Sequence, residues 1–539
     1  MTLRFTRRLV LAGAAAVALS SALLPAADAR AQGVLRIGMT AADIPLTNGS
    51  PDNGFEGFRF SGYTMYDGLV NWDLTAADKP SVIKPGLALS WEANPQDTTK
   101  WTFKLRPGVK FHDGSAFDAK AVAWNFDKLL NKDAPHFDAR QASLVGFRAA
   151  SVASYRVVDD LTIEFTTKAP DSFLPYQLSF ILMASPAQYE AVGKDWSKFA
   201  AQPSGTGPFK LTSLVPRERA ELAPNKAYWD AARVPKLDKL ILIPMPEANT
   251  RTAALLSGQV DLVEAPPPDT IDRLKSSGMT ITSNPYPHVW PYHLSRLPDS
   301  PWNDVRVRKA ANLAIDREGL GELLGGFAVP AKGHVVADSA WFGKPSFDIK
   351  YDLEAAKKLM AEAGYGPDKR IKTKAIISPS GSGQMLPLPM NEFIQQNLAE
   401  IGIDLEFEVM EITSLINRWR AGAKAEQNAG ASIINFSYAT VDPFNAFVRF
   451  VKSDLHAPNG VNWGFYADPA MDALVSKAQN AFDPQAQAEI LGQLHAKMVD
   501  DALFLWVVHD VAPRAMSPKV KGFVQARNWF LDLSGVTVQ

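Results

Sequence analysis

The chain has 539 residues, 46% of them hydrophobic and 21% charged, which is ordinary for a globular protein and too long for a single hydrophobic core. Its 56 Lys and Arg nearly balance 57 Asp and Glu, so the net charge of −1 argues against nucleic acid as a partner. The sequence contains no Cys, which excludes disulfides and thiolate metal sites.

The first 31 residues predict an export signal that is cleaved. Three Arg precede an apolar stretch from Leu9 to Pro25, and the small residues Ala29 and Ala31 form a cleavage site. A membrane-spanning helix is the alternative, but the run is shorter than the ~20 apolar residues that a bilayer demands. Thr6 to Leu11 resembles the twin-arginine export motif, so twin-arginine and general secretory export both stay open.

Cleavage after Ala31 would remove four Arg and one Asp, leaving 52 basic and 56 acidic residues and a net charge of −4. With no Cys behind the signal there is no thiol to carry a lipid, so we expect no lipid anchor. An untethered exported protein is useful inside an enclosed compartment. We therefore expect a free protein of the periplasm, in a Gram-negative bacterium.

Apolar runs and helical patterns alternate along the rest of the chain. The predicted strands are Val34 to Met39, Leu161 to Phe165, Leu240 to Ile243, Ile403 to Val409 and Ile433 to Phe436. Asp118 and Asp352 each precede an amphipathic pattern as helix N-caps, and Gly364 closes the second helix. The alternation predicts an α/β fold.

A stretch of different texture runs from Trp101 to Gly114. Trp101 to Arg106 alternates strictly, Pro107-Gly108 offers a turn, and Val109 to Phe111 follows before a second turn. This pattern predicts antiparallel hairpins.

Several motifs together resemble a known family. They are Tyr66-Asp67-Gly68-Leu69, residues 85–92 (PGLALSWE), residues 101–114 (WTFKLRPGVKFHDG), Gly205-Thr206-Gly207-Pro208-Phe209, residues 225–229 (NKAYW), 258–263 (GQVDLV), 305–310 (VRVRKA), 314–318 (AIDRE), Asp442-Pro443-Phe444 and 519–523 (KVKGF). In this order and spacing they resemble the extracellular solute-binding proteins of family 5. Such proteins serve ABC importers of peptides, nickel chelates, glutathione and some opines or sugars.

The resemblance implies a two-lobed clam-shell of the cluster C type with an extra inserted domain. Lobe I would comprise 32–67, 205–289 and 511–539, the extra domain 68–204, and lobe II 290–510. A small solute, peptide or peptide-like, would bind between the lobes of a monomer and pass to an inner-membrane ABC permease. No cofactor and no metal are expected, and transport and a sensory role both stay open.

The first predicted wall of the binding site is the segment from Asn53 to Tyr63. Aromatic residues alternate there with Gly on a presumed loop, so we expect Phe55, Phe58 or Tyr63 to stack on solute and Glu56 to meet a cationic group. A plain loop over the core is the alternative. Trp290 is a weaker candidate at the hinge side of the cleft, with buried packing equally open.

The second predicted wall follows the strand that ends near residue 436, and Phe436 and Tyr438 are its best candidates. In the peptide-binding relatives an acidic residue three positions before Asp-Pro holds the peptide's amino terminus, and here that position is Ala439. Asp442 itself is interpreted as a turn residue. An opine, a glycoside or a chelated metal is therefore the alternative to a peptide, and we expect Ala439→Asp to alter ligand preference without affecting stability.

Catalysis is not expected. His112-Asp113-Gly114 is interpreted as a hairpin corner and Gly205-Thr206-Gly207 as a crossing near a hinge, rather than as catalytic or phosphate-binding motifs. The eight His are scattered and form no metal-binding pattern. An exported hydrolase remains the rival from another class, although the sequence has no nucleophile elbow and no zincin helix.

Overall fold

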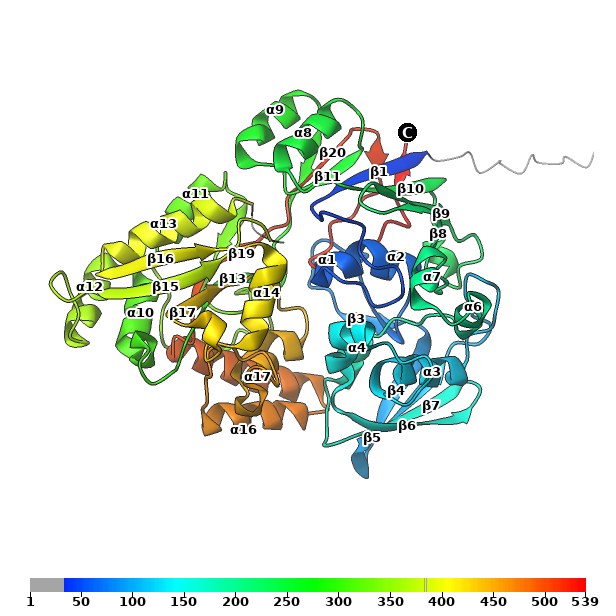
Figure 1. The fold of residues 1–539 in the computed structure, drawn as a ribbon, viewed down its shortest axis with the longest axis horizontal. Helices are drawn as coiled ribbons and strands as arrows, with labels where there is room; N and C mark the ends of the chain where they lie inside the picture. Colours follow the sequence, from blue (N-terminus) through cyan, green and yellow to red (C-terminus); the bar gives the residue numbers. More distant parts are fainter. Residues whose placement is uncertain (1–32, 382, 384) are drawn as a thin grey trace, which may run out of the picture. The chain divides into compact units, whose positions relative to one another are not determined.

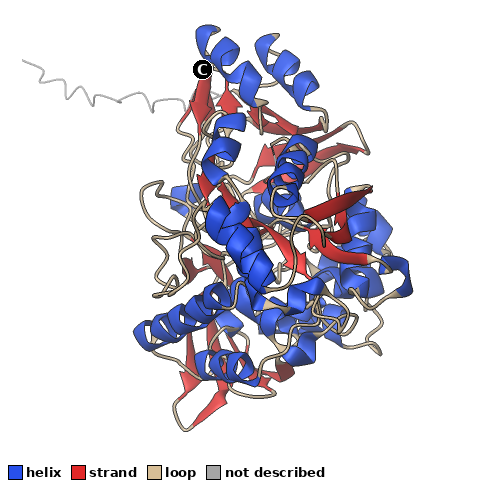
Figure 2. Cartoon of the chain, turned by 90° about the vertical axis from the view of Figure 1, so that its left-hand side faces the viewer, coloured by secondary structure: helices blue, strands red, loops and turns tan. Residues whose placement is uncertain are grey.

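The computed structural model describes residues 33–381, 383 and 385–539. The segment predicted to be an export signal, 1–31, lies outside the described residues. From Gly33 to Gln539 the described chain is one compact unit of mixed helices and strands (Figures 1 and 2). Within the described part, no helix has both the length and the apolar character needed to cross a bilayer.

The first large sheet has seven strands in the order β12-β20-β11-β1-β10-β9-β8. The strands are β1 (Val34–Met39), β8 (Phe209–Val215), β9 (Arg219–Pro224), β10 (Lys239–Pro244), β11 (Leu262–Glu264), β12 (Thr280–Thr282) and β20 (Arg514–Met516). β1 lies parallel to both β10 and β11, and the late strand β20 pairs antiparallel with β11 and β12. Helices α8 (Ala248–Leu256) and α9 (Ile271–Ser276) contact β11 and β12 (Figure 1). Three distant stretches of chain therefore build one sheet.

A smaller antiparallel sheet, in the order β4-β5-β7-β6, lies between β1 and β8 in the sequence. Its strands are β4 (Ala88–Asn94), β5 (Asp97–Leu105), β6 (Val152–Asp159) and β7 (Thr162–Thr167). The other elements of this region are α1 (Gly54–Gly57), a π-helical turn (Phe58–Gly62), α2 (Tyr63–Met65), the hairpin β2 (Val70–Trp72) and β3 (Ile83–Pro85), α3 (Ala119–Leu130), α4 (Ala139–Val145), a 3-10 turn (Gly146–Ala149), α5 (Leu174–Leu178), α6 (Pro186–Ala191) and α7 (Trp196–Ala201).

The hairpins predicted for residues 101–114 are only partly present. Trp101 to Leu105 is a strand in an antiparallel sheet, but its partners are β4 and β7. Residues 109–111 form no strand and contribute an isolated bridge between Lys110 and Ala116. Pro107 has no N–H to donate and Gly108 takes φ +75°, so the chain leaves the sheet here instead of folding back along β5.

The second large sheet carries β14-β19-β13-β17-β15-β16, with β18 paired to β13. The strands are β13 (His288–Leu294), β14 (Ala328–Pro330), β15 (Ile371–Ile377), β16 (Ile403–Val409), β17 (Ala431–Asn435), β18 (Tyr438–Ala439) and β19 (Phe504–Asp510). The helices are α10 (Val305–Ala314), α11 (Arg317–Leu323), α12 (Leu353–Glu362), α13 (Pro387–Ala399), α14 (Ile412–Ala421), α15 (Arg449–Val451), α16 (Pro469–Gln479) and α17 (Pro484–Asp500). β21 (Val520–Lys521) and β22 (Thr537–Val538) form a terminal hairpin.

Side-chain caps fix two of the predicted helices. Asp118 accepts a hydrogen bond from the N–H of Ala121 at the start of α3, and Asp352 accepts one from Ala355 at the start of α12. Each carboxylate satisfies one of the orphan N–H groups of a first helical turn. Gly364 follows α12 at φ +82°, a left-handed conformation that other residues adopt at a cost.

The hydrophobic core is divided. One cluster joins β1 and β10 of the first sheet with the antiparallel sheet and its helices. Two further clusters cover the two faces of the second sheet. The chain crosses between the two large sheets at 283–287 and again at 511–513, and the hydroxyl of Tyr286 donates to Asp510 at 2.6 Å beside these crossings. The lobe boundaries given above remain a proposal.

Candidate solute-binding site

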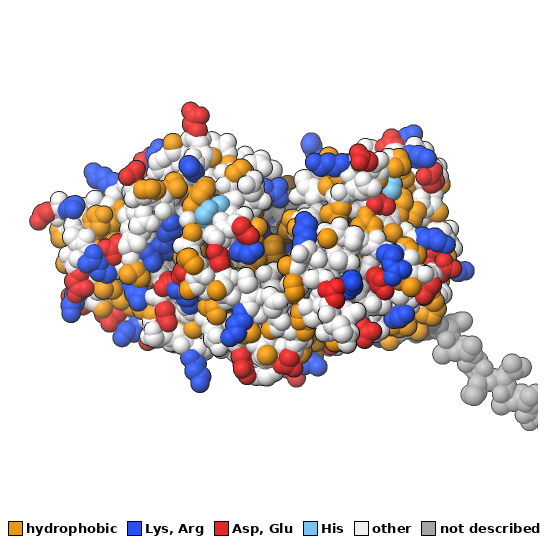
Figure 3. Space-filling model, turned by 90° about the horizontal axis from the view of Figure 1, so that it is seen from below, with side chains coloured by type: hydrophobic (Ala, Val, Ile, Leu, Met, Phe, Trp, Pro, Cys, Tyr) orange, Lys and Arg blue, Asp and Glu red, His pale blue; other side chains and the backbone are white. Residues whose placement is uncertain are grey.

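Three parallel strands of the second sheet end at the same edge. β15 lies between β16 and β17, and the three strands end at Ile377, Val409 and Asn435. In sheets of this kind, ligands bind in the crevice outside the carboxyl ends of the strands. The segment 436–449, which leaves this edge after β17, is therefore well placed to contact a solute. The described surface is hollowed between two masses, with hydrophobic side chains in the hollow (Figure 3).

Phe436 and Tyr438 belong to an aromatic group on this segment. Phe436 stacks on Trp419 of α14 with ring centroids 4.8 Å apart, and Tyr438 packs on Phe450 at 4.3 Å. Phe436 is half-buried, whereas Tyr438 is buried and its hydroxyl hydrogen-bonds the His334 ring at 3.1 Å. Phe436 thus keeps ring surface open, while Tyr438 supports it from the core.

Ala439 lies in β18 and is 1% exposed. Its backbone pairs with His288 of β13, and its carbonyl accepts a hydrogen bond from the Asn445 side chain at 3.0 Å. A larger side chain at position 439 would therefore be attached to a backbone that is buried and held by hydrogen bonds.

A buried ion pair joins this segment to the antiparallel region. Arg148 and Asp442 are 5% and 0% exposed, and Nη1 of Arg148 lies 3.3 Å from Oδ2 of Asp442. Gln177 donates to the other carboxylate oxygen at 3.0 Å, and the Asn445 N–H donates to the same oxygen at 2.9 Å. The Arg148 guanidinium also stacks over the Phe180 ring at 3.9 Å. Asp442, interpreted from the sequence as a turn residue, lies just before a helical segment, accepts from an N–H of that segment, and binds a residue 294 positions away.

A second arginine, Arg449, stands beside this pair. Its Nη1 donates to Oδ1 of Asn445 at 2.6 Å, and its guanidinium lies 5.0 Å from the Trp419 ring and from the Phe450 ring. Burial first, and then the neighbouring Arg148 guanidinium, lower the pKa of Arg449 to about 9. Positive charge is therefore concentrated at this place.

The segment 53–63, predicted to be a loop, is helical from Gly54 onward, and its rings are directed into an aromatic cluster. Phe55 meets Phe180 edge-on at 5.6 Å and Phe58 meets it at 5.4 Å. Tyr63 packs on Phe530 at 4.6 Å and donates its hydroxyl to the carbonyl of Ser179 at 2.9 Å. Phe55 and Tyr63 are half-buried, whereas Phe58 is buried. Stacking of these rings on solute stays a prediction.

Glu56 is 7% exposed and lies among charged groups of the first sheet. Thr40 donates to its carboxylate, and Arg59 and Glu264 are its charged neighbours. Burial, followed by the negative charge of Glu264, raises the pKa of Glu56. A contact of Glu56 with a cationic solute group also stays a prediction.

Trp290 is fully buried on β13. Its ring lies 5.4 Å from that of Tyr292, within the core cluster on one face of the second sheet. This is the packing environment that the sequence left open, and a role for Trp290 in binding remains a prediction.

His112 and the glycines at 205 and 207 lie together. The His112 ring accepts from the N–H of Gly205 at 3.4 Å and its Nε2 lies 2.9 Å from the Gly207 carbonyl. Burial lowers the pKa of His112 to about 4, so the ring is neutral. A Cβ on Gly207 would lie 2.4 Å from the backbone of Met65 and Tyr66. These glycines are therefore required by a close approach of two backbone segments.

Residues 33–381, 383 and 385–539 contain no group of three or more His, Cys, Asp or Glu side chains placed to hold an ion.

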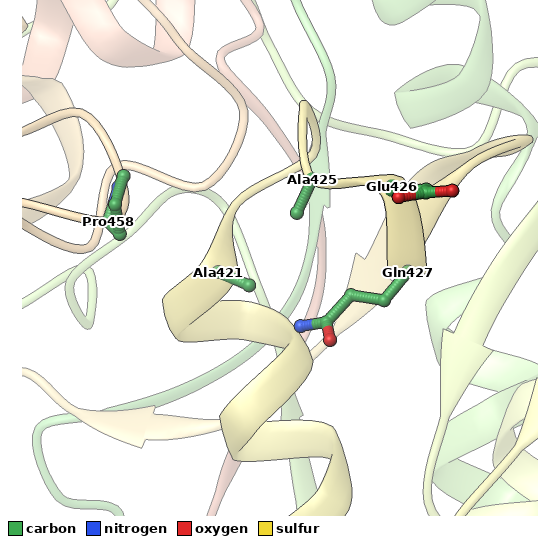
Figure 4. A pocket seen from close by; sticks show the side chains of 5 residues that line it. All are labelled: Ala421, Ala425, Glu426, Gln427 and Pro458. Carbon is green, nitrogen blue, oxygen red and sulfur yellow. The ribbon is translucent and has the colours of Figure 1, made fainter.

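A surface pocket of about 600 Å³ lies at the end of α14 (Figure 4). It is lined by Ala421, Ala425, Glu426, Gln427 and Pro458, with Glu426 as its charged member. Its lining combines three small apolar residues with Glu426 and Gln427 and includes no aromatic ring, unlike the surface around Phe436.

Sequence reasoning missed Arg148, Gln177, Asn445 and Arg449. Asn445 and Arg449 follow Asp442 by three and seven positions, a helical spacing that places side chains on one face, and this signal was available. Arg148 and Gln177 carry no comparable signal, because they reach Asp442 only through the fold.

Comparison with known proteins agrees with this architecture. Residues 82–455 match the family described as bacterial extracellular solute-binding proteins, family 5 Middle. Heme-binding protein A of Haemophilus influenzae is 27% identical over 498 residues, covering 89% of this chain and 88% of that protein. The glutathione-binding protein GsiB of Pectobacterium atrosepticum is 27% identical over 530 residues, covering 96% and 95%. The Helicobacter pylori periplasmic binding protein DppA, solved with the peptide STSA, superposes with a TM-score of 0.80 at 24% identity, covering 94% and 98%.

The chain therefore belongs to the bacterial extracellular solute-binding proteins of family 5. It has their mixed α/β, two-lobed fold, and it is an extracellular solute-binding protein.

Proposed function

We propose that the protein captures a peptide or peptide-like solute in the periplasm and delivers it to an inner-membrane permease of an ABC importer. In this proposal it acts as a monomer, without a cofactor and without catalysis. The lobes are those placed from the sequence, with residues 68–204 as the extra domain. Relatives named for binding glutathione and a solved neighbour holding the peptide STSA support a peptide-like solute.

The observation that carries the proposal is the contact between segment 436–449 and the inserted region. Arg148 and Gln177 from that region reach Asp442, and the Phe147 ring stacks on Phe444 at 6.2 Å. A solute held at the carboxyl ends of β15 and β17 would touch both sides of this contact. Ligand that contacts both sides favours the closed form, which is the means by which such proteins signal occupancy.

A non-peptide solute is the second candidate, and Ala439 favours it. A buried methyl group stands where the peptide binders place a carboxylate for the amino terminus, and a buried ammonium without a partner costs several kcal/mol. An opine, a glycoside or a chelated metal would not need that carboxylate.

The proposal is tested by native mass spectrometry of the protein purified from a periplasmic extract, followed by thermal unfolding with peptides of two to five residues. A bound peptide mass is expected, and saturating peptide at 100 times its Kd should stabilise the protein by about 2.7 kcal/mol. A bound opine, sugar or chelate, with no peptide raising the melting temperature, would support the second candidate. Turnover of any peptide or glycoside would contradict the absence of catalysis.

A further inference from the structure

Two guanidinium groups converge on one amide oxygen beside the aromatic surface of segment 436–449. Nη2 of Arg148 lies 3.3 Å from Oδ1 of Asn445, and Nη1 of Arg449 lies 2.6 Å from the same atom. The side-chain amide nitrogen of Asn445 donates a hydrogen bond to the carbonyl of Ala439. Asn445 therefore holds both arginines close to Ala439, the residue that differs from the acidic residue of the peptide-binding relatives.

The charges at this place do not balance. Beyond the effect of burial, the charges of Arg148 and Arg420 both lower the pKa of Arg449, and the charge of Asp442 raises it. The Asp442 carboxylate is already engaged by Arg148, Gln177 and the Asn445 N–H. Like charges held together in a partly buried site repel strongly. An added anion would relieve that repulsion.

Arg449 also has hydrogen-bonding capacity to spare. It is half-buried, and its Nε is buried without a hydrogen-bond acceptor in the described part of the chain. The rings of Trp419, Phe450 and Phe147 lie 5.0, 5.0 and 5.8 Å from its guanidinium. These rings restrict how the guanidinium can turn, and a guanidinium held in this way is suited to receive a carboxylate.

We propose that Arg449, supported by Arg148, receives a carboxylate of the solute, so that the protein selects anionic peptides over neutral or cationic ones. The inference rests on the proposed function and names the solute class for that site. According to this inference, the solute group that reaches segment 436–449 is negatively charged. Ala439 then belongs to a site that binds a carboxylate and excludes an ammonium group.

The test uses the full mature chain, stripped of ligand by unfolding and refolding, and isothermal titration calorimetry with three matched peptides. Ala-Ala-Glu, Ala-Ala-Gln and the amide of Ala-Ala-Gln carry two, one and no carboxylates. Removing the carboxylate that binds Arg449 should weaken binding about 10- to 100-fold, the range for a hydrogen bond between charged groups. In Arg449→Gln that loss should shrink to less than about threefold, because the charge is gone.

Two further variants keep the test decisive. Arg449→Lys retains the positive charge but not the forked donors, so removal of the solute carboxylate should still weaken its binding, though less than in the unaltered protein. This variant serves as the test if Arg449→Gln does not fold. Arg156→Gln, at an exposed pair with Glu164, should bind the series as the unaltered protein does.

Affinities that do not depend on carboxylate number, or an equal loss in Arg449→Gln, would overturn the inference while leaving peptide binding in place. If no peptide of the series binds, both this inference and the proposed function fail.

Discussion

Asp442 is a fully buried carboxylate, and its charge is compensated by a residue from a distant part of the chain. Arg148 and Gln177 reach it across 294 and 265 positions, and the Asn445 N–H completes its contacts. A buried pair of this kind contributes little net stability against a well-packed apolar replacement. Removing one partner is different, because the other is left as an uncompensated buried charge.

The variant Asp442→Asn should therefore lose about 3 to 5 kcal/mol of unfolding free energy, because Arg148 stays buried without a counter-charge. Urea unfolding followed by circular dichroism measures it. Asp160→Asn, at an exposed pair with Lys120, is the matched control and should unfold as the unaltered protein does. The double variant Arg148→Met with Asp442→Leu should recover most of the loss. A single variant as stable as the parent would contradict the role of this pair.

Ala439→Asp tests the residue that departs from the peptide binders. The sequence alone predicted no effect on stability, but Ala439 is 1% exposed, so burying a polar side chain should cost about 2 kcal/mol. The new carboxylate would lie near the arginines that Asn445 holds and should reduce the preference for Ala-Ala-Glu over Ala-Ala-Gln. Ala439→Asn is the neutral control for size. Calorimetry with both peptides checks the result, and an unchanged preference would count against this placement of the site.

At the scale of elements, much of the fold could be predicted from local pattern. The strands at Val34–Met39 and Ile403–Val409 lie where apolar runs placed them, and Asp118 and Asp352 cap their helices. The partner of β5 was predicted wrongly, because alternation marks a strand and its faces but not its neighbour. The place of Phe436 at the end of a strand could also be predicted, and its contact with solute stays a prediction. The arginines of the site could not be predicted, because their contacts arise only when distant segments pack.

The crossing of Gly207 over Met65 and Tyr66 gives a prediction about backbone packing. Gly207→Ala would place a Cβ 2.4 Å from that backbone, which cannot move as a side chain can, so a loss of about 1 to 3 kcal/mol is expected. Gly321→Ala in α11 is the control, since nothing lies within 4 Å of its added Cβ. This change should be neutral or stabilising by up to about 1 kcal/mol. Equal melting temperatures for the two variants would contradict the close approach.

At the scale of the whole molecule, buried histidines dominate the expected pH dependence. Burial lowers the pKa of His288 and His293 to about 3, lowers that of His112, His495 and His509 to about 4, and lowers that of His334 well below its ordinary value. An unfolded chain protonates the same rings near pH 6.5. Folding stability is therefore greatest above that pH and falls as the pH decreases toward 4.

Each such histidine lowers the free energy of unfolding by about 1.4 kcal/mol per pH unit within this window. The carboxyl groups Glu56, Asp171 and Asp510 have raised pKa values and act in the opposite sense, but they are fewer. Urea unfolding at pH 7.5, 6.0 and 5.0 should show a decline of at least about 3 kcal/mol overall. A constant or rising stability toward pH 5 would contradict the neutral, buried state of these rings.

The contact between Arg148 and Asp442 has a consequence for how such proteins diversify. Its hydrogen bonds are made by the chain itself, so the closed form keeps them whichever solute favours that form. Positions around it, such as Phe436 and Ala439, can then change without loss of that contact. Substitutions at these positions can therefore change which solute is bound while the contact between Arg148 and Asp442 stays the same.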